Sequence, residues 1–259
     1  MISEENNNPV RIFLSGCSGH MGHVIIDICS TLDDVKIVAG ADSKSQDLGF
    51  PVYARSDECR EEFDVIIDFS HPSALPAVLR LAESTKNPLV MCTTGFSDGE
   101  IQQIKALSDK CAVFLSGNMS LGINVLLELV KRAAEVLSSE FDIEIIEAHH
   151  RRKIDAPSGT ALMIANEINN SQGDIFEYQY DRHSEKKPRD NHVIGIHSVR
   201  GGNIVGEHSV LFAGPEENLT ISHSANTRDV FARGAVKAAV FMKGKDPGLY
   251  SMKDLLGRQ

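Results

Sequence analysis

The stretch from Val10 to Leu32 restricts the fold most, because it reads as a strand, a glycine turn and a helix in immediate succession. The apolar run Val10–Leu14 leads into SGCSGHMG, and a helical pattern covers Val24–Leu32. The three spaced glycines suit a tight turn, the close approach of a pyrophosphate and close packing of helix on strand, and they are Gly16, Gly19 and Gly22. The spacing is GxxGxxG rather than GxGxxG, so an ordinary strand-to-helix turn is the alternative.

A second strand strengthens the dinucleotide interpretation. Val35–Ala41 is apolar and ends at Asp42, about twenty residues after the last glycine of the turn. An acidic side chain at that place can accept hydrogen bonds from the ribose hydroxyls of a dinucleotide.

Strands and helices continue to alternate up to residue 120. Each expected strand ends in small polar residues, as at the ligand-binding edge of an open parallel sheet. The expected strands are Asp64–Phe69, Pro88–Cys92 and Ala112–Leu115, and the expected helices are Ala74–Ala82 and Asp98–Leu107. The pattern predicts an α/β, Rossmann-type domain.

The central part of the chain follows a different pattern. A long amphipathic helix is expected over Leu121–Leu137, a strand over Phe141–Glu147 and a helix from Ser158. The polar segment 171–192 is long for a plain connection and suggests an arm, a subunit contact or a lid. Three successive strands of an antiparallel sheet are then expected, with Gly201-Gly202-Asn203 as one turn, over Val193–Val199, Ile204–Phe212 and Asn218–Ser222.

A final helix, expected over Asn226–Met242, could return the chain to the first domain. We therefore expect a dinucleotide-binding domain from residues 1–120 with 227–259, and a central α+β domain for substrate binding and oligomerisation from residues 121–226, with a mostly antiparallel sheet. Arg228 in the opening turn suits either a surface ion pair or a carboxylate clamp.

The segment EAHHRRKIDAPSGT, residues 147–160, concentrates the chemistry. Its imidazoles and cations follow a half-buried strand, and small hydroxylated residues then precede a helix. Free amides at a helix start, with the dipole behind them, can bind a carboxylate. A single histidine, a basic run or an SGT cap is each usually structural, but together they predict a site where a small acidic molecule gains a proton.

The basic residues of this segment are a local feature of a chain that is acidic as a whole. The formal net charge is −10, which argues against nucleic acid or an anionic membrane as a partner.

The five cysteines include no CxxC pair, which favours reduced thiols and no metal site. Cys92 follows a strand and reads as a packed thiol rather than a nucleophile. No apolar run reaches membrane-spanning length, and we expect a cytoplasmic protein.

Several motifs together resemble the 4-hydroxy-tetrahydrodipicolinate reductase (dihydrodipicolinate reductase) family of diaminopimelate and lysine biosynthesis. They run in order along nearly the whole chain as GCSGHMG, FDVIIDFS, CTTGF, IEIIEAHHRRKIDAPSGTAL, SVRGGNIVGEH and TR-x-x-FARGA. The resemblance implies reduction of a cyclic dicarboxylate with NADH or NADPH, and a homotetramer assembled through the substrate-domain sheets.

The resemblance also implies roles for individual residues. His149 matches the acid/base histidine of the family and Lys153 its proton-donating lysine. The residues that would hold the substrate carboxylates are His150, Ser158, Gly159, Thr160 and Arg228. The cofactor contacts would be Gly16, Cys17, Ser18, Gly19, His20, Met21, Asp42, Cys92, Thr93, Thr94, Ser116, Gly117, Asn118 and Met119.

Two departures from the family pattern bear on the cofactor. The family often has arginine at the position of His20 and directly after the acidic ribose residue, where this chain has Ser43 and then Lys44. These arginines help to bind the extra phosphate of NADPH. Their absence favours NADH, although Lys44 or a protonated His20 could accept that phosphate.

Two other functions fit parts of the pattern. One is a different two-domain NAD(P)-dependent reductase of a small acid, but a semialdehyde dehydrogenase would need a nucleophilic cysteine, and no cysteine lies beyond Cys111. The other is a sensor that binds a dinucleotide without turnover. Such a sensor would not need the histidine and lysine of EAHHRRK.

Overall fold

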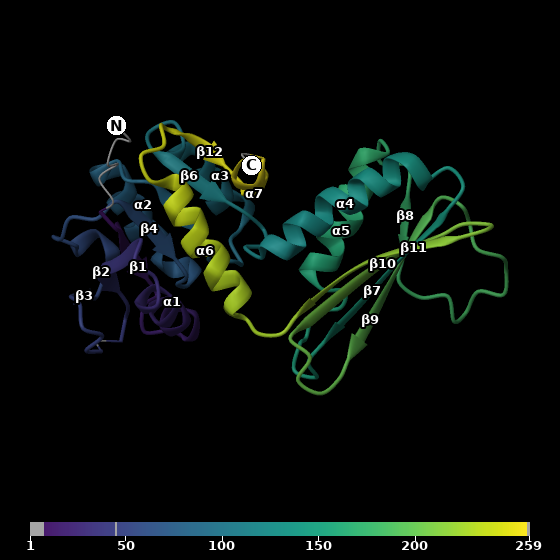
Figure 1. Cartoon of the computed structure of the whole chain (residues 1–259), viewed down its shortest axis with the longest axis horizontal. Coiled ribbons are helices and arrows are strands. Elements are labelled where there is room, and N and C mark those ends of the chain that lie inside the picture. The colour runs from purple at the N-terminus through teal and green to yellow at the C-terminus, as the bar shows by residue number, and fades with distance from the viewer. Residues whose placement is uncertain (1–7, 45, 258–259) are drawn as a thin grey trace, which may run out of the picture. The chain divides into compact units, whose positions relative to one another are not determined.

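The computed structural model describes residues 8–44 and 46–257. It divides into two compact units, one formed by residues up to Ser120 together with those from Asp229 on, and the other by Leu121–Arg228 (Figure 1). We call them unit 1 and unit 2. Among the described residues, no helix combines the length and the apolar character needed to cross a membrane.

Unit 1 contains a parallel sheet of seven strands in the order β12-β6-β5-β4-β1-β2-β3. The strands are β1 Val10–Ser15, β2 Val35–Ala41, β3 Val52–Tyr53, β4 Val65–Asp68, β5 Leu89–Met91, β6 Ala112–Leu115 and β12 Gly248–Tyr250. Its helices are α1 His20–Ser30, α2 Leu75–Thr85, α3 Asp98–Leu107, α6 Asp229–Met242 and α7 Met252–Leu256, with 3-10 turns η1 Ser56–Glu58 and η2 Pro72–Ala74. This confirms the predicted Rossmann-type sheet.

The glycine turn after β1 is as tight as its spacing indicates. Gly16 has a φ of +82°, and a side chain there would overlap the carbonyl group of Phe69. A side chain at Gly22 would overlap the backbone of Gly16 and Cys17, so only glycine lets α1 start this close to β1. The helix begins at His20, earlier than the apolar pattern from Val24 suggests, because its first turn carries two exposed histidines and a glycine in place of a run of apolar side chains.

Unit 2 contains a sheet of five strands in the order β11-β10-β7-β9-β8. Its elements are α4 Leu121–Leu137, β7 Asp142–His149, α5 Gly159–Ser171, β8 Glu177–Gln179, β9 Val193–Arg200, β10 Gly206–Ala213 and β11 Asn218–Ala225. The helices α4 and α5 pack together, and their apolar side chains share one core with the inward residues of β7, β9 and β10 (Figure 1). The predicted α+β unit with antiparallel strands is confirmed, and β7 is its central strand.

The pairing expected within this sheet is partly wrong. β10 runs antiparallel to β7 and β11, but β9 runs parallel to β7, so β9 and β10 are separated by β7 and form no hairpin. The loop after β9 instead closes the end of β7, because Gly201 N–H donates to the His149 carbonyl at 2.9 Å and Arg151 N–H to that of Gly202 at 3.3 Å. A local turn signal therefore marked a crossover between strands that are not neighbours.

The polar segment 171–192 is partly tied to the sheet. It contains the short strand β8, which pairs in parallel with β9. Near its end, Arg189 donates to Glu144 and Asp142, both at 2.8 Å. Its role as an arm, a subunit contact or a lid stays a prediction.

Candidate active site

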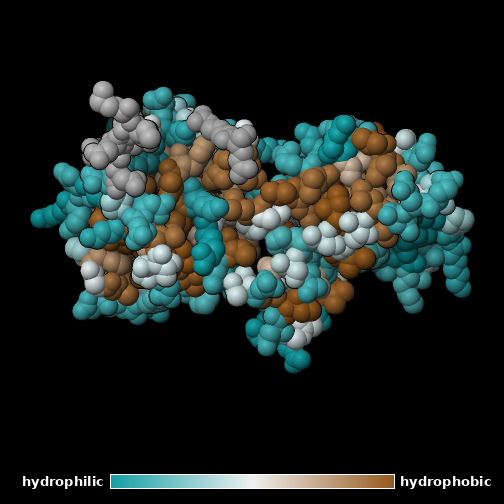
Figure 2. Space-filling model, viewed as in Figure 1, coloured by the Kyte–Doolittle hydropathy of each residue, from teal (hydrophilic) through white to brown (hydrophobic). Residues whose placement is uncertain are grey.

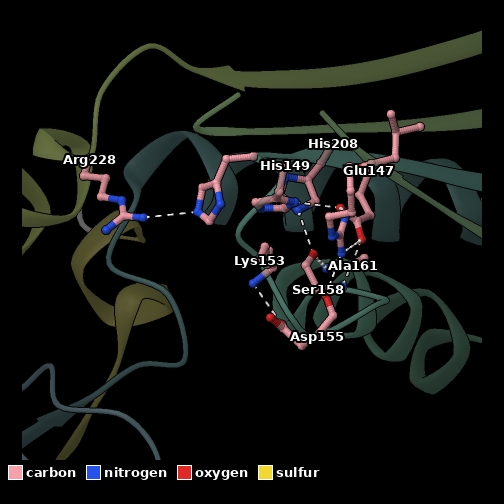
Figure 3. A network of polar contacts seen from close by, with 11 residues as sticks. Glu147, His149, Lys153, Asp155, Ser158, Ala161, His208 and Arg228 are labelled. Atoms are coloured by element: carbon pink, nitrogen blue, oxygen red, sulfur yellow. Dashed lines mark hydrogen bonds and ion pairs between the residues drawn. The ribbon is translucent and has the colours of Figure 1, made fainter. Parts of the chain in front are cut away.

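The central strand β7 carries two inward polar residues at its end. Because side chains alternate along a strand, Glu147 and His149 follow the buried Ile143 and Ile145 on the same face. Glu147 has no exposed surface, and its carboxylate lies 2.6 Å from Nδ1 of His149 (Figure 3). A buried carboxylate thus contacts the histidine for which an acid/base role is expected.

Arg200 of β9 neutralises this carboxylate. Its Nη1 and Nη2 each donate to one carboxylate oxygen of Glu147, both at 2.7 Å, and the Ser158 N–H donates to the same carboxylate at 3.1 Å. Burial alone would raise the pKa of Glu147, but the hydrogen bonds it accepts, above all from Arg200, lower the pKa to about 2. Glu147 is therefore ionised at neutral pH although it is buried.

A second imidazole from β10 packs against His149. The rings of His149 and His208 meet edge to face, with centroids 5.2 Å apart, and His208 Nε2 lies 3.1 Å from the hydroxyl of Ser158. Burial, together with the charge of His149, lowers the pKa of His208 to about 4. His208 is thus a neutral neighbour of His149 at physiological pH.

The low pKa of His208 predicts loss of stability in mild acid. The folded protein keeps His208 neutral down to about pH 4, whereas an unfolded chain protonates it near the ordinary value of 6.5. The free energy of unfolding should therefore fall between pH 6.5 and 4, by up to about 3 kcal/mol from this group. His208→Gln should flatten that part of a urea-unfolding series, and equal slopes for the two proteins would refute the assignment. Glu147 loses its contribution in a separate window, between pH 4.5 and about 2.

Two other cations near this site, Lys153 and Arg228, each contact a neighbouring side chain. Lys153 forms an ion pair of 2.9 Å with Asp155, which lowers the pKa of that carboxyl (Figure 3). Arg228 Nη2 lies 3.2 Å from Nε2 of His150. Burial and then the charges of Arg152 and Arg228 lower the pKa of His150, so a negatively charged group placed here would be favoured.

The start of α5 completes the site. The Ser158 hydroxyl caps the helix by accepting from the Ala161 N–H at 3.1 Å. The same hydroxyl therefore both stabilises the helix start and contacts His208. Gly159 and Thr160 form the first turn, and a side chain at Gly159 would meet nothing within 4 Å. The open space beside Gly159 and the positive end of the helix dipole suit an anion.

All of the predicted cofactor residues lie in unit 1, at the carboxyl edge of its sheet, and half of them surround the ends of β1 and β2. Gly16, Cys17, Ser18 and Gly19 form the turn after β1, His20 and Met21 begin α1, and Asp42 follows β2. The first turn of α1 has neither a side-chain cap nor an acidic residue, which suits a pyrophosphate. A cavity of about 520 Å³ is lined there by Gly16, Gly19 and Asp42 among others.

The Asp42 side chain forms hydrogen bonds with backbone N–H groups of two loops. Its carboxylate accepts from the Ser18 N–H at 3.1 Å and the Lys44 N–H at 3.0 Å. The side chain of Cys17 is fully buried, so only its backbone can face a ligand.

The remaining predicted residues follow β5 and β6 at the same edge and do not line this cavity; they are Cys92, Thr93, Thr94, Ser116, Gly117, Asn118 and Met119. Burial raises the pKa of the Cys92 thiol well above its ordinary value, as expected of a packed thiol. Thr93 donates at 2.6 Å to the buried carboxyl of Asp68, whose pKa is raised by burial. Asp68 also accepts from Ser70 at 2.6 Å, so it ties together the loops after β4 and β5.

Both units match models of one protein family. Residues 10–119 match "Dihydrodipicolinate reductase, N-terminus" and residues 122–256 match "Dihydrodipicolinate reductase, C-terminus". The chain belongs to the dihydrodipicolinate reductase family.

Curated proteins and a solved structure of the dihydrodipicolinate reductase family are similar to this chain over nearly its whole length. The 4-hydroxy-tetrahydrodipicolinate reductase of Caldanaerobacter subterraneus subsp. tengcongensis is 50% identical over 95% of this chain and 98% of its own length. The protein of that name from Clostridium tetani is 46% identical over 95% and 97%. The solved structure of dipicolinate-bound dihydrodipicolinate reductase from Paenisporosarcina sp. TG-14 shares the fold, with a TM-score of 0.78 at 24% identity, over 95% of this chain and 99% of that one.

Sequence reasoning missed three residues of the polar cluster around His149. Glu147 was read as part of a strand, and Arg200 and His208 were quoted only within the motif SVRGGNIVGEH. The inward alternation Ile143, Ile145, Glu147 was the available signal, because a carboxylate at a core position must have a partner.

Proposed function

We propose that this chain reduces dihydrodipicolinate, formed by loss of water from 4-hydroxy-tetrahydrodipicolinate, to tetrahydrodipicolinate in diaminopimelate and lysine biosynthesis. Family membership over both units carries the proposal. The paired His149 and Glu147 support it, because they supply a proton-exchanging imidazole beside an anion-binding helix start. A dinucleotide sensor would have no use for that pair.

The substrate roles follow from the chemistry of unit 2. His149 gives the proton that completes the reduction, and Lys153 stabilises the negative charge that develops on the ring or relays the proton. The carboxylates are held by the amides of the first turn of α5 and by nearby polar side chains: His150, Ser158, Gly159, Thr160 and Arg228. Arg228 and His150 support this clamp because their side chains already lie together.

A reduced nicotinamide dinucleotide completes the chemistry. When bound, it supplies a hydride to the conjugated carbon and is oxidised, while the proton from the protein balances the reaction. Unit 1 would hold it, with the glycine turn and α1 on the pyrophosphate and Asp42 on the ribose; the loops after β5 and β6 would take the nicotinamide side, through Cys92, Thr93, Thr94 and Ser116–Met119. The acid at residue 42, with Ser43 after it, favours NADH over NADPH.

Assembly and location extend the proposal. We expect a cytoplasmic homotetramer formed through unit 2, with no nucleic-acid partner. Outward apolar side chains on its sheet support self-association, since Ile146 and Val199 are 43% and 49% exposed. Apolar residues also gather over α4 in the space-filling view (Figure 2). Val125, Leu129 and Val136 of this helix are exposed. Light scattering of the purified chain would test the tetramer.

A spectrophotometric assay tests the function. Oxidation of NADH or NADPH should depend on the condensation product of pyruvate and aspartate semialdehyde, and pyridine-2,6-dicarboxylate should inhibit it competitively. Competitive titration with both nucleotides should give the lower Kd for NADH. Cofactor oxidation without that substrate, or none with it, would refute the proposed reaction.

A further inference from the structure

We infer that Glu147 and Arg200 are positioning residues that hold His149 with Nδ1 as the donor to Glu147, so that Nε2 is the atom that exchanges the proton. This inference rests on the proposed function, since it specifies how His149 would act in it. It assigns roles to two side chains that themselves touch no substrate.

The tautomer follows from the hydrogen-bonding capacity of the carboxylate. An ionised carboxylate can only accept, so the 2.6 Å contact between Glu147 and His149 requires a proton on Nδ1. Arg200 keeps Glu147 ionised through its two bonds of 2.7 Å. Arg200 is itself fixed by donating to the carbonyls of Asp155 at 2.6 Å and Val199 at 2.7 Å. These contacts occupy Nδ1 of His149, and within the described part of the chain they leave Nε2 as the nitrogen that can exchange a proton.

Nε2 is kept accessible by a glycine. Gly206, at the start of β10, lies beside the His149 ring, and a Cβ there would be 3.2 Å from Nε2. The edge-to-face contact with His208 fixes the plane of the ring from the same strand. The ring is therefore oriented on one side by β7 and on the other by β10, and the missing side chain at Gly206 leaves space beside Nε2.

The same arrangement sets the charge balance of proton transfer. When the His149 imidazolium gives its Nε2 proton, the neutral ring keeps Nδ1–H, and the proton does not pass to Glu147. The charged and titratable groups around His149 are Glu147 on its own strand, the adjacent His150, Arg200 from β9 and His208 from β10. Lys153 from the following loop acts on the two other imidazoles, His150 and His208.

The test compares Glu147→Gln with Glu144→Gln. Glu144 is a matched control, because it also contacts one arginine and one histidine, Arg189 and His197, both at 2.8 Å, but on the opposite face of β7. Glu147→Gln should lower kcat roughly 10- to 100-fold with little change in KM, part of the 10²- to 10⁴-fold that a general acid contributes. Its pH–kcat profile should move to lower pH, because the imidazolium loses its carboxylate. Glu144→Gln should match the unchanged protein.

A double variant separates positioning from folding. Glu147→Gln with Arg200→Met removes both charges of the pair, so stability should recover towards that of the unchanged protein. If kcat and the pH profile recover with it, the pair is merely structural and the inference is overturned. Low kcat in a stable double variant supports positioning.

Nitrogen-15 NMR of the unsubstituted protein provides a test that needs no turnover. The His149 signals, assigned by their absence in His149→Gln, should show the neutral ring protonated at Nδ1, whereas a proton on Nε2 would overturn the inference. The two proposals fail differently. An active enzyme with the other tautomer refutes this inference alone, and an inactive enzyme with the expected tautomer refutes the proposed function.

Discussion

His149→Gln is expected to lower kcat roughly 10²- to 10⁴-fold, the range that general acid catalysis usually contributes. Glutamine can still accept or donate a hydrogen bond beside Glu147, but it cannot release a proton near neutral pH. The nucleotide is expected to bind unit 1, so the Kd for NADH, measured by fluorescence titration, should stay within about twofold. The loss should therefore fall on turnover rather than on cofactor affinity.

His197→Gln is the control for that substitution. His197 also contacts a glutamate of β7, since its Nε2 lies 2.8 Å from Glu144, but its side chain is on the outer face of the sheet and 47% exposed. It should keep the kcat of the unchanged protein. Equal turnover in both variants would remove His149 from the mechanism, and an equal loss in both would point to a general effect on the sheet.

Local patterns in the sequence predicted most of the strands and helices of unit 1. Each strand of unit 1 that the apolar runs predicted is present, because buried parallel strands are apolar throughout and are separated by helices of regular period. The short strand β12 near the end of the chain was not predicted, since its three residues pair with β6, far away in sequence. Pairing of that kind leaves no local signal.

The second unit shows where such reasoning stops. The segment around His149 was recognised as the chemical centre, but its partners were not, because Arg200 reaches Glu147 from 53 residues away. The hairpin predicted at residues 201–203 was wrong because strand pairing again depends on distant residues. Turn residues show where a strand ends, not which strand lies beside it. Placing β7 between β9 and β10 is what brings Arg200 and His208 to the two sides of Glu147 and His149.

Gly234→Ala should destabilise unit 1 by about 3 kcal/mol or more, at the upper end of what overpacking costs. Gly234 lies in α6, where an added Cβ would overlap the carbonyl oxygen of Met119 in the buried loop after β6. Backbone cannot turn aside as a flexible side chain can, so the helix or the loop must move. The gain in helix propensity, up to about 1 kcal/mol, offsets only part of this cost.

The melting temperature of the Gly234→Ala protein should fall by roughly 6 to 12 °C, since each kcal/mol shifts Tm by about 2 to 4 °C in a chain of this size. Gly99→Ala is the matched change, because Gly99 also lies in a helix, α3, but a Cβ there would meet nothing within 4 Å. It should leave Tm unchanged or slightly raised, and a fall equal to that of Gly234→Ala would show that the close approach to Met119 is not the cause.

Met119 belongs to the loop expected to contact the nicotinamide, so a smaller loss of Tm with weaker NADH binding would mean that the loop, rather than α6, had moved. The close approach of Gly234 to this loop would then set the cofactor site as well as the stability of unit 1.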